Sequence, residues 1–287
     1  MRGPTLPMSS HDTPICRVDL SPVDYAHVPQ APRIERRVIL ARDETNPWQM
    51  RGVLGVDAGG RALGISNHTW SHVDAPFHRV ARGATLDRIA PAHYLASRTR
   101  VVDLTTSTAP GRRETIRGVS YHSLIDDADL PASLDGYEAL LFVTGFGPLI
   151  EQGYPMTGDA DHHYPSLTAA AAKRLAALPA LRLVAMDSPT VDKPAADGIA
   201  HVTLLGRTPS PVLLVETLTC ERLRRAAKPL PVEGLLTVEP LRAFGPEPDG
   251  ALASVYFYFA RPGHDAAFET FSKTLRDATL ASCGVTL

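Results

Sequence analysis

The stretch from His68 to His78 is the sequence feature that most constrains how this chain can fold. It places histidines at 68, 72 and 78 and an aspartate at 74. In an extended strand alternate residues share a face, so these even-numbered side chains would point to one side. Pro76 makes a helix the second-best interpretation, because it lacks an N–H group and disfavours helical backbone at the preceding residue. Imidazoles and a carboxylate on one side suit Zn²⁺, Mn²⁺ or Fe²⁺.

The spacing of the first two histidines adds a constraint on such a site. At about 3.3 Å per residue, His68 and His72 would lie ~13 Å apart along a flat strand. Ring nitrogens that each bind at ~2.1 Å can share an ion only if the chain bends between them. We therefore expect either a bend around one metal ion or two separate ions.

The same stretch resembles the H-x-G-T-H-x-D-x-P-x-H motif of the cyclase-like metal-dependent hydrolases, the family of bacterial kynurenine formamidase and isatin hydrolase. The motif positions that match are His68, His72, Asp74, Pro76 and His78. Trp70 stands where the family usually has Gly, and Ser71 stands where it usually has Thr.

Two later segments extend the resemblance, which runs from about Val18 to about Ala260. Residues 187–192, Asp-Ser-Pro-Thr-Val-Asp, look like the family's D-S-P-S-x-D stretch, and His201 with Glu216 looks like its later ligand pair. The gap between His201 and Glu216 is wider than expected, with a small loop insertion at 207–211. The resemblance implies that His68, His72 and Asp74 are the primary metal ligands. His201 and Glu216 would close that site or hold a second ion.

The resemblance also implies an activity: hydrolysis of a C–N bond in an amide, a formamide or a lactam-like ring. Zinc or manganese, as one or two ions, would activate water, and His78 would shuttle the proton to the leaving nitrogen. Trp70 and Phe77 would offer an aromatic small-molecule substrate a stacking wall, or else serve only in packing. Two alternatives stay open: a biosynthetic cyclase or lyase that uses the same metal site, and a non-catalytic metal-bearing binding protein.

The composition fits a globular enzyme rather than a nucleic-acid or membrane protein. The 287 residues include 29 basic and 31 acidic side chains without clusters of either sign, so we expect neither nucleic acid nor a membrane as partner. No apolar stretch approaches the ~20 residues that span a bilayer. The three cysteines are far apart, which predicts no disulfide framework and favours the cytoplasm.

The pattern of apolar runs predicts an α/β fold. Runs at 100–104, 137–144 and 181–186 are continuous rather than alternating, which is typical of strands covered on both faces. Ser166 or Thr168 can cap a helix that ends near Leu178. We expect one compact domain over residues 15–262, a mixed sheet with flanking helices of the swivelling β/β/α type that the resemblance implies. Residues 1–14 would form a flexible tail and residues 263–287 a C-terminal helical extension.

The resemblance further implies a homodimer or a tetramer. Residues 21–50 are rich in proline and charge, yet they contain an apolar run at 38–40 and Trp48. This segment would either reach across to a partner and bring Trp48 to the neighbour's substrate pocket, or fold back on its own subunit.

Overall fold

The computed structural model describes residues 13–21, 41–42, 50–56, 62–68, 70–153, 163–193, 198–241 and 248–282. Trp48 and nearly all of the predicted N-terminal tail lie outside these ranges, so the proposals that concern them stay predictions.

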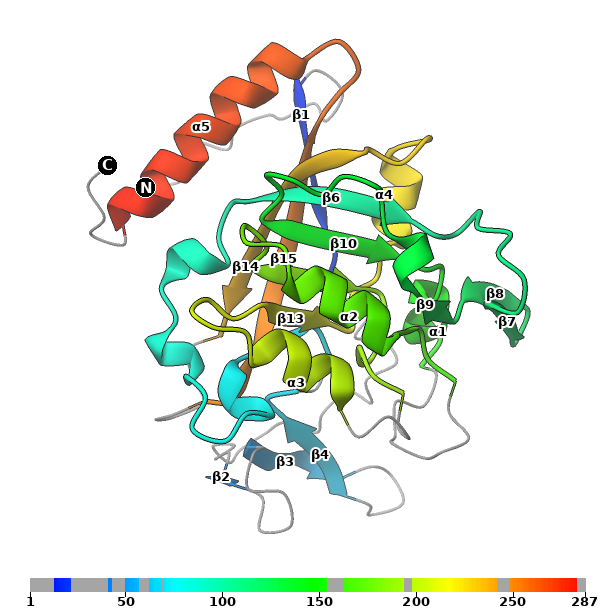
Figure 1. The fold of residues 1–287 in the computed structure, drawn as a ribbon, viewed down its shortest axis with the longest axis vertical. Helices are drawn as coiled ribbons and strands as arrows, with labels where there is room; N and C mark the ends of the chain where they lie inside the picture. Colours follow the sequence, from blue (N-terminus) through cyan, green and yellow to red (C-terminus); the bar gives the residue numbers. More distant parts are fainter. Residues whose placement is uncertain are drawn as a thin grey trace, which may run out of the picture.

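An eight-stranded mixed sheet forms the centre of the described structure (Figure 1). Its order is β1 (Ile15–Asp19), β15 (Gly250–Ala260), β14 (Glu233–Pro240), β6 (Ser97–Asp103), β10 (Ala139–Val143), β12 (Leu183–Met186), β13 (Leu213–Glu216) and β5 (His72–Asp74). Strands β6, β10, β12 and β13 run parallel, and the other neighbours pair antiparallel. Because β5 also pairs with β15, the sheet closes into a barrel-like arrangement.

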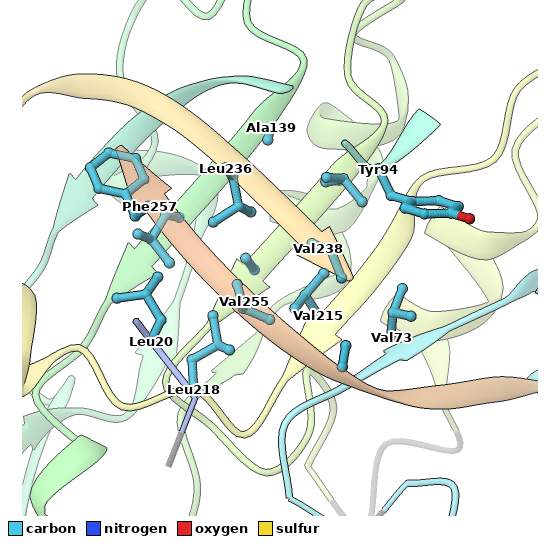
Figure 2. Close-up of a cluster of buried hydrophobic side chains, with 14 of the residues drawn as sticks. Leu20, Val73, Tyr94, Ala139, Val215, Leu218, Leu236, Val238, Val255 and Phe257 are labelled. Atoms are coloured by element: carbon cyan, nitrogen blue, oxygen red, sulfur yellow. The ribbon is translucent and has the colours of Figure 1, made fainter. Parts of the chain in front are cut away.

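Two apolar cores explain why the central strands are continuously hydrophobic. Along β10, Ala139, Leu141 and Val143 belong to a core that receives side chains from every strand of the closed barrel. Leu140 and Phe142 point the other way, into a core under the helices. Figure 2 shows part of the first core, where Val215, Val238 and Val255 from three strands meet. The predicted runs at 100–104, 137–144 and 181–186 thus contribute β6, β10 and β12, and the α/β fold with flanking helices is confirmed.

Helices α2 (Ala169–Ala176) and α3 (Ile199–Leu205) cover the outer face of the parallel strands (Figure 1). Thr168, one of the two predicted caps, accepts a hydrogen bond from the Ala171 backbone N–H at 3.1 Å and so begins α2. The smaller elements are β2 (Ala41–Arg42), β3 (Met50–Val56), β4 (Ala62–Ser66), β7 (Arg113–Ile116), β8 (Val119–His122), β9 (Leu124–Ile125), β11 (Ser166–Leu167), α1 (Gly147–Glu151) and α4 (Glu221–Ala226).

The predicted C-terminal helix is present as α5 (Asp265–Ser282), which lies along one side of the molecule (Figure 1). Its side chains from Asp265 to Ala281 are exposed or half-buried, so it contributes little to the two cores. Arg276 pairs with Glu138 at 2.8 Å, and the Phe271 ring contacts Tyr258. None of the helices in the described ranges has the length and hydropathy to cross a bilayer.

Candidate metal centre

Strand β5 places two of the predicted ligands in the wall of the barrel. It carries His72 and Asp74 between β13 and β15, and His72 is paired in register with Glu216. Both side chains are almost fully buried. Such a short strand, hydrogen-bonded on both edges, holds its side chains in fixed positions.

The prediction of one extended strand through 68–78 is wrong. Trp70 has a φ of 58°, in the left-handed region that an L-residue adopts only at a cost, and this turns the chain between His68 and His72. After β5, Pro76–His78 forms the 3-10 helix η2, which turns His78 back toward the cluster. The rings of His68 and His72 therefore lie 5.0 Å apart, and those of His68 and His78 lie 4.1 Å apart. Of the two alternatives left open by the spacing, a bend or two separate ions, the structure has the bend, at Trp70.

Four donor groups form a closed ring inside this cluster. Nε2 of His72 lies 3.4 Å from Asp74 Oδ1 and 3.3 Å from Glu216 Oε2. Nε2 of His201 lies 3.4 Å from Asp74 Oδ2 and 3.4 Å from Glu216 Oε1. These separations exceed the ~2.7–3.2 Å of a hydrogen bond. Taken one by one, they are close to the ~3.3–3.6 Å between two donors at a tetrahedral angle on an ion with bonds of ~2.0–2.2 Å.

The two histidines of this ring are held in the orientation that metal binding requires. His72 Nδ1 lies 2.9 Å from the Trp70 carbonyl oxygen, and His201 Nδ1 lies 2.6 Å from Asp192 Oδ2. When Nδ1 donates its hydrogen to these acceptors, the lone pair is on Nε2, which faces the ring. Asp192 also accepts the backbone N–H groups of Ala200 and His201 at 2.8 and 3.0 Å, so it fixes the start of α3.

The two carboxylates complete the test of whether these residues fit a divalent cation. Glu216, at the end of β13, accepts the Val191 N–H at 2.7 Å through Oε1. Asp74 Oδ2 is buried and finds no hydrogen-bond partner among the described residues. Two buried carboxylates balance a charge of 2+, and a cation would pair with Asp74 Oδ2, which lies 3.4 Å from His201 Nε2, beyond the usual length of a hydrogen bond. The donor set therefore fits a divalent ion.

A second group, His68, His78 and Asp249, adjoins the ring. His68 lies between two carboxylates, with Nδ1 2.8 Å from Asp74 Oδ1 and Nε2 3.0 Å from Asp249 Oδ2. His78 Nδ1 lies 3.1 Å from the same Asp249 oxygen. Three groups have ligand atoms close enough to hold an ion: His68 with His72 and Asp74, His68 with His78 and Asp249, and Asp74 with His78 and His201.

The electrostatics of the cluster reflect its buried carboxylates. Burial alone would lower the pKa of His72 and of His201, but the negative charges of Asp74 and Glu216 outweigh it and raise each pKa to about 10. Without a metal ion, protons on these two imidazoles supply the positive charge that the carboxylates require. The pKa of His78 instead falls to about 4, because burial and the neighbouring His68 both disfavour its cation.

The structure thus brings together all six side chains predicted to bind metal or move a proton: His68, His72, Asp74, His78, His201 and Glu216. Trp70 and Phe77, predicted to contact substrate, are half-buried; Trp70 lies two residues before His72, and Phe77 directly precedes His78. Sequence reasoning missed Asp249 as a site residue and did not recognise that Asp192 orients His201. The D-S-P-T-V-D stretch contains Asp192 and pointed to its role, whereas no sequence signal distinguished Asp249.

Taken together, the closed α/β barrel and its buried histidine–carboxylate cluster define a class of protein with a candidate divalent-cation centre. The sequence model of the Cyclase family matches residues 8–193, which is well over half of the chain. The chain belongs to the Cyclase family.

Solved structures show the same fold. Isatin hydrolase A from Labrenzia aggregata, bound to benzyl benzoate, is 17% identical with a TM-score of 0.55, covering 86% of this chain and 94% of that one. Isatin hydrolase A from Ralstonia solanacearum is 18% identical with a TM-score of 0.55, covering 85% and 92%. An isatin hydrolase bound to the product analogue thioisatinate is 15% identical with a TM-score of 0.56, covering 86% and 94%. Among curated proteins, none matches this chain in sequence.

Proposed function

We propose that this protein is a metal-dependent hydrolase that cleaves a C–N bond in a small amide, formamide or lactam-like molecule. The observation that carries the proposal is the ring of His72, Asp74, His201 and Glu216, whose donor separations of 3.3–3.4 Å suit an ion better than hydrogen bonds. Membership of the Cyclase family and the likeness to isatin hydrolases, which are named for a cyclic amide, support the reaction class.

In this proposal the four ring residues hold the ion, with His68 as a further ligand at its edge. An ion that also held water as a further ligand beside these residues, and so was more than four-coordinate, would lower the pKa of that water toward ~7 and polarise the substrate carbonyl. Asp192 and the Trp70 carbonyl keep the two histidine Nε2 atoms turned inward. Zinc and manganese are the leading candidates, as one or two ions, because nitrogen and oxygen donors accept both.

His78 is the proposed proton shuttle. It is buried, its ring lies 5.7 Å from that of His201, and its lowered pKa of about 4 keeps it neutral at physiological pH. A neutral imidazole can take a proton from the attacking water and deliver it to the nitrogen that leaves. The water oxygen bonds to the carbonyl carbon, and the electron pair of the broken C–N bond stays on the nitrogen, which becomes an amine that leaves or, in an opened lactam, stays attached through the rest of the ring.

The substrate class follows from the aromatic residues next to the ligands. Trp70 and Phe77 are each partly exposed, so they can present a flat apolar surface to an aromatic amide. Trp48 remains a proposed contributor, brought by residues 21–50 of the same or a neighbouring subunit. Assembly as a homodimer or tetramer remains part of this proposal, and light scattering of the purified protein tests it.

The experiment is a substrate panel on protein stripped of metal and reconstituted with Zn²⁺ or Mn²⁺. The panel contains isatins, N-formyl arylamines and small lactams. We expect metal-dependent ring opening or deformylation, and a fall in kcat of roughly 100-fold for His78→Gln with metal content unchanged. His264→Gln, at an exposed position before α5, is the matched control. A folded, metal-loaded protein that hydrolyses nothing in the panel contradicts the proposal and favours ring closure or ligand binding instead.

A further inference from the structure

Asp249 occupies a place in the cluster that neither the motif nor the proposed ion requires. Its side chain is 1% exposed, and Oδ2 lies 3.0 Å from His68 Nε2 and 3.1 Å from His78 Nδ1. One buried carboxylate oxygen is therefore within hydrogen-bond distance of a nitrogen from each of two imidazole rings. The His68 and His78 rings are tilted 33° to each other, and their centroids lie 4.1 Å apart. Their shared contact with Asp249 Oδ2 therefore links two rings that also contact each other.

The Asp249 carboxylate is itself rigidly held. Its other oxygen, Oδ1, accepts from the side-chain amide of Asn67 at 2.5 Å, and the same amide also donates to the Gly250 carbonyl oxygen at 3.0 Å. The Asp249 backbone carbonyl accepts the Ala75 N–H at 2.8 Å, in the link between β5 and η2. The next residue, Gly250, pairs in register with Asp74. Asp249 thus directly precedes β15, at the point where that strand pairs with β5, which carries Asp74.

This arrangement has a chemical consequence for His78. A carboxylate is an acceptor only, so a neutral imidazole that meets it through Nδ1 keeps its hydrogen on Nδ1. The lone pair is then on Nε2, which makes Nε2 the nitrogen that can accept a proton. We propose that Asp249 is a positioning residue that fixes His78 as the Nδ1–H tautomer and aims Nε2 for proton transfer. The inference rests on the proposed function, since it assigns the partner of the proposed shuttle.

The test reads the tautomer directly, without turnover. Long-range ¹H–¹⁵N correlation spectra of the full-length Zn²⁺-loaded protein distinguish Nδ1–H from Nε2–H imidazoles, and His78→Gln assigns the His78 signals. We expect Nδ1–H for His78 in the wild-type protein and a loss of that preference in Asp249→Asn. Asp277→Asn, at an exposed position of α5, controls for the charge change and should leave the spectrum unchanged.

Several outcomes would overturn the inference. Nε2–H for His78 in the wild-type protein does so alone, even if Asp249→Asn fails to fold. An unchanged tautomer in Asp249→Asn does so as well. Loss of metal from that variant would make Asp249 a ligand rather than a positioning residue. If the protein hydrolysed nothing, the proposed function would fail while the tautomer result would still decide the role of Asp249.

Kinetics on any hydrolysed panel member give an independent reading. Asp249→Asn should lower kcat by roughly 10- to 100-fold with KM within about twofold, because the variant loses the orientation of His78 for proton transfer and no contact that binds substrate. Adding Asp249→Asn to His78→Gln should cause no further loss, because both act through one imidazole. Additive losses would contradict the inference.

Discussion

Substitutions at Asp192 can separate effects on folding stability from effects on metal affinity. Its carboxylate does two jobs with two oxygens. Oδ1 accepts the Ala200 N–H at 2.8 Å, whereas Oδ2 accepts the His201 N–H at 3.0 Å and lies 2.6 Å from His201 Nδ1. The first job satisfies buried N–H groups at the start of α3 that have no partner within the helix, and the second turns His201 Nε2 toward the ring. Two substitutions can separate these jobs.

Asp192→Ala removes both. Loss of a helix cap costs about 1 kcal/mol, and loss of a charge-assisted hydrogen bond to a buried imidazole costs about 1.5–3 kcal/mol, so the free energy of unfolding should fall by about 3 kcal/mol. Asp192→Asn keeps an acceptor for the cap, because Asn caps helices about as well as Asp. Its amide NH₂ then faces His201 Nδ1, whose hydrogen moves to Nε2, and it also faces the His201 backbone N–H, which loses its acceptor. This variant should lose roughly 100-fold in metal affinity and about 1–2 kcal/mol of stability, less than Asp192→Ala.

The assays are urea unfolding of the metal-free protein and a Zn²⁺ titration in competition with a chelator. Thr168→Ala is the matched control, because it removes the cap of α2, which is not part of the metal cluster. It should lose about 1 kcal/mol of stability with unchanged metal affinity. If Asp192→Asn binds Zn²⁺ as tightly as the wild-type protein, the assignment of Asp192 as the residue that orients His201 is wrong.

Four further predictions follow from the geometry of the site and of α5. Zn²⁺ binding near pH 7.5 should release about two protons, measured by calorimetry in buffers of different ionisation enthalpy, because His72 and His201 have pKa values raised to about 10 and must deprotonate to bind. By the same linkage, the protonated forms of His72 and His201 stabilise the metal-free protein fully below pH ~6.5, and this contribution is lost as pH rises through about 10. If the metal-free protein unfolds no more readily at pH 10 than at pH 7, the raised pKa values of these histidines are wrong. Trp70→Gly should be about 1 kcal/mol more stable than Trp70→Ala in urea unfolding, because the φ of 58° disfavours any L-residue, and the reverse order would show that this turn is not strained. Arg276→Gln, which breaks the pair with Glu138, should change global stability by less than about 1 kcal/mol while hydrogen exchange in α5 accelerates; unchanged exchange would show that the pair does not hold α5 in place.

The sequence predicted the parts of this molecule that depend on local pattern. Continuous apolar runs indicated the buried parallel strands, and Thr168 before an apolar stripe indicated the start of α2. The histidines and aspartate of residues 68–78 indicated a converging site, because that residue set has few other uses in a folded protein. The reach of the chain between His68 and His72 left two alternatives, a bend around one ion or two separate ions, and the structure has a bend at Trp70.

The remaining features depend on contacts between distant segments. The barrel closes because β5 pairs with β15, and nothing in a three-residue strand specifies a partner so far along the chain. Asp249 lies between Pro248 and Gly250, a pattern that is typical of a turn. Only the pairing of Gly250 with Asp74, far apart in the sequence, brings Asp249 to His78. Gly250 itself leaves room for the His68 side chain, because a Cβ at position 250 would lie 2.7 Å from His68 Cε1 and 2.7 Å from the Val73 carbonyl oxygen.

Anomalous X-ray diffraction from crystals of protein purified without chelator tests the central claim most directly. Data on both sides of the zinc and manganese absorption edges locate and identify any bound ion. The account predicts a peak enclosed by His72 Nε2, His201 Nε2 and the carboxylates of Asp74 and Glu216, about 2.0–2.2 Å from each donor. The absence of a peak after reconstitution with either metal, or a peak bound only by other residues, would contradict it.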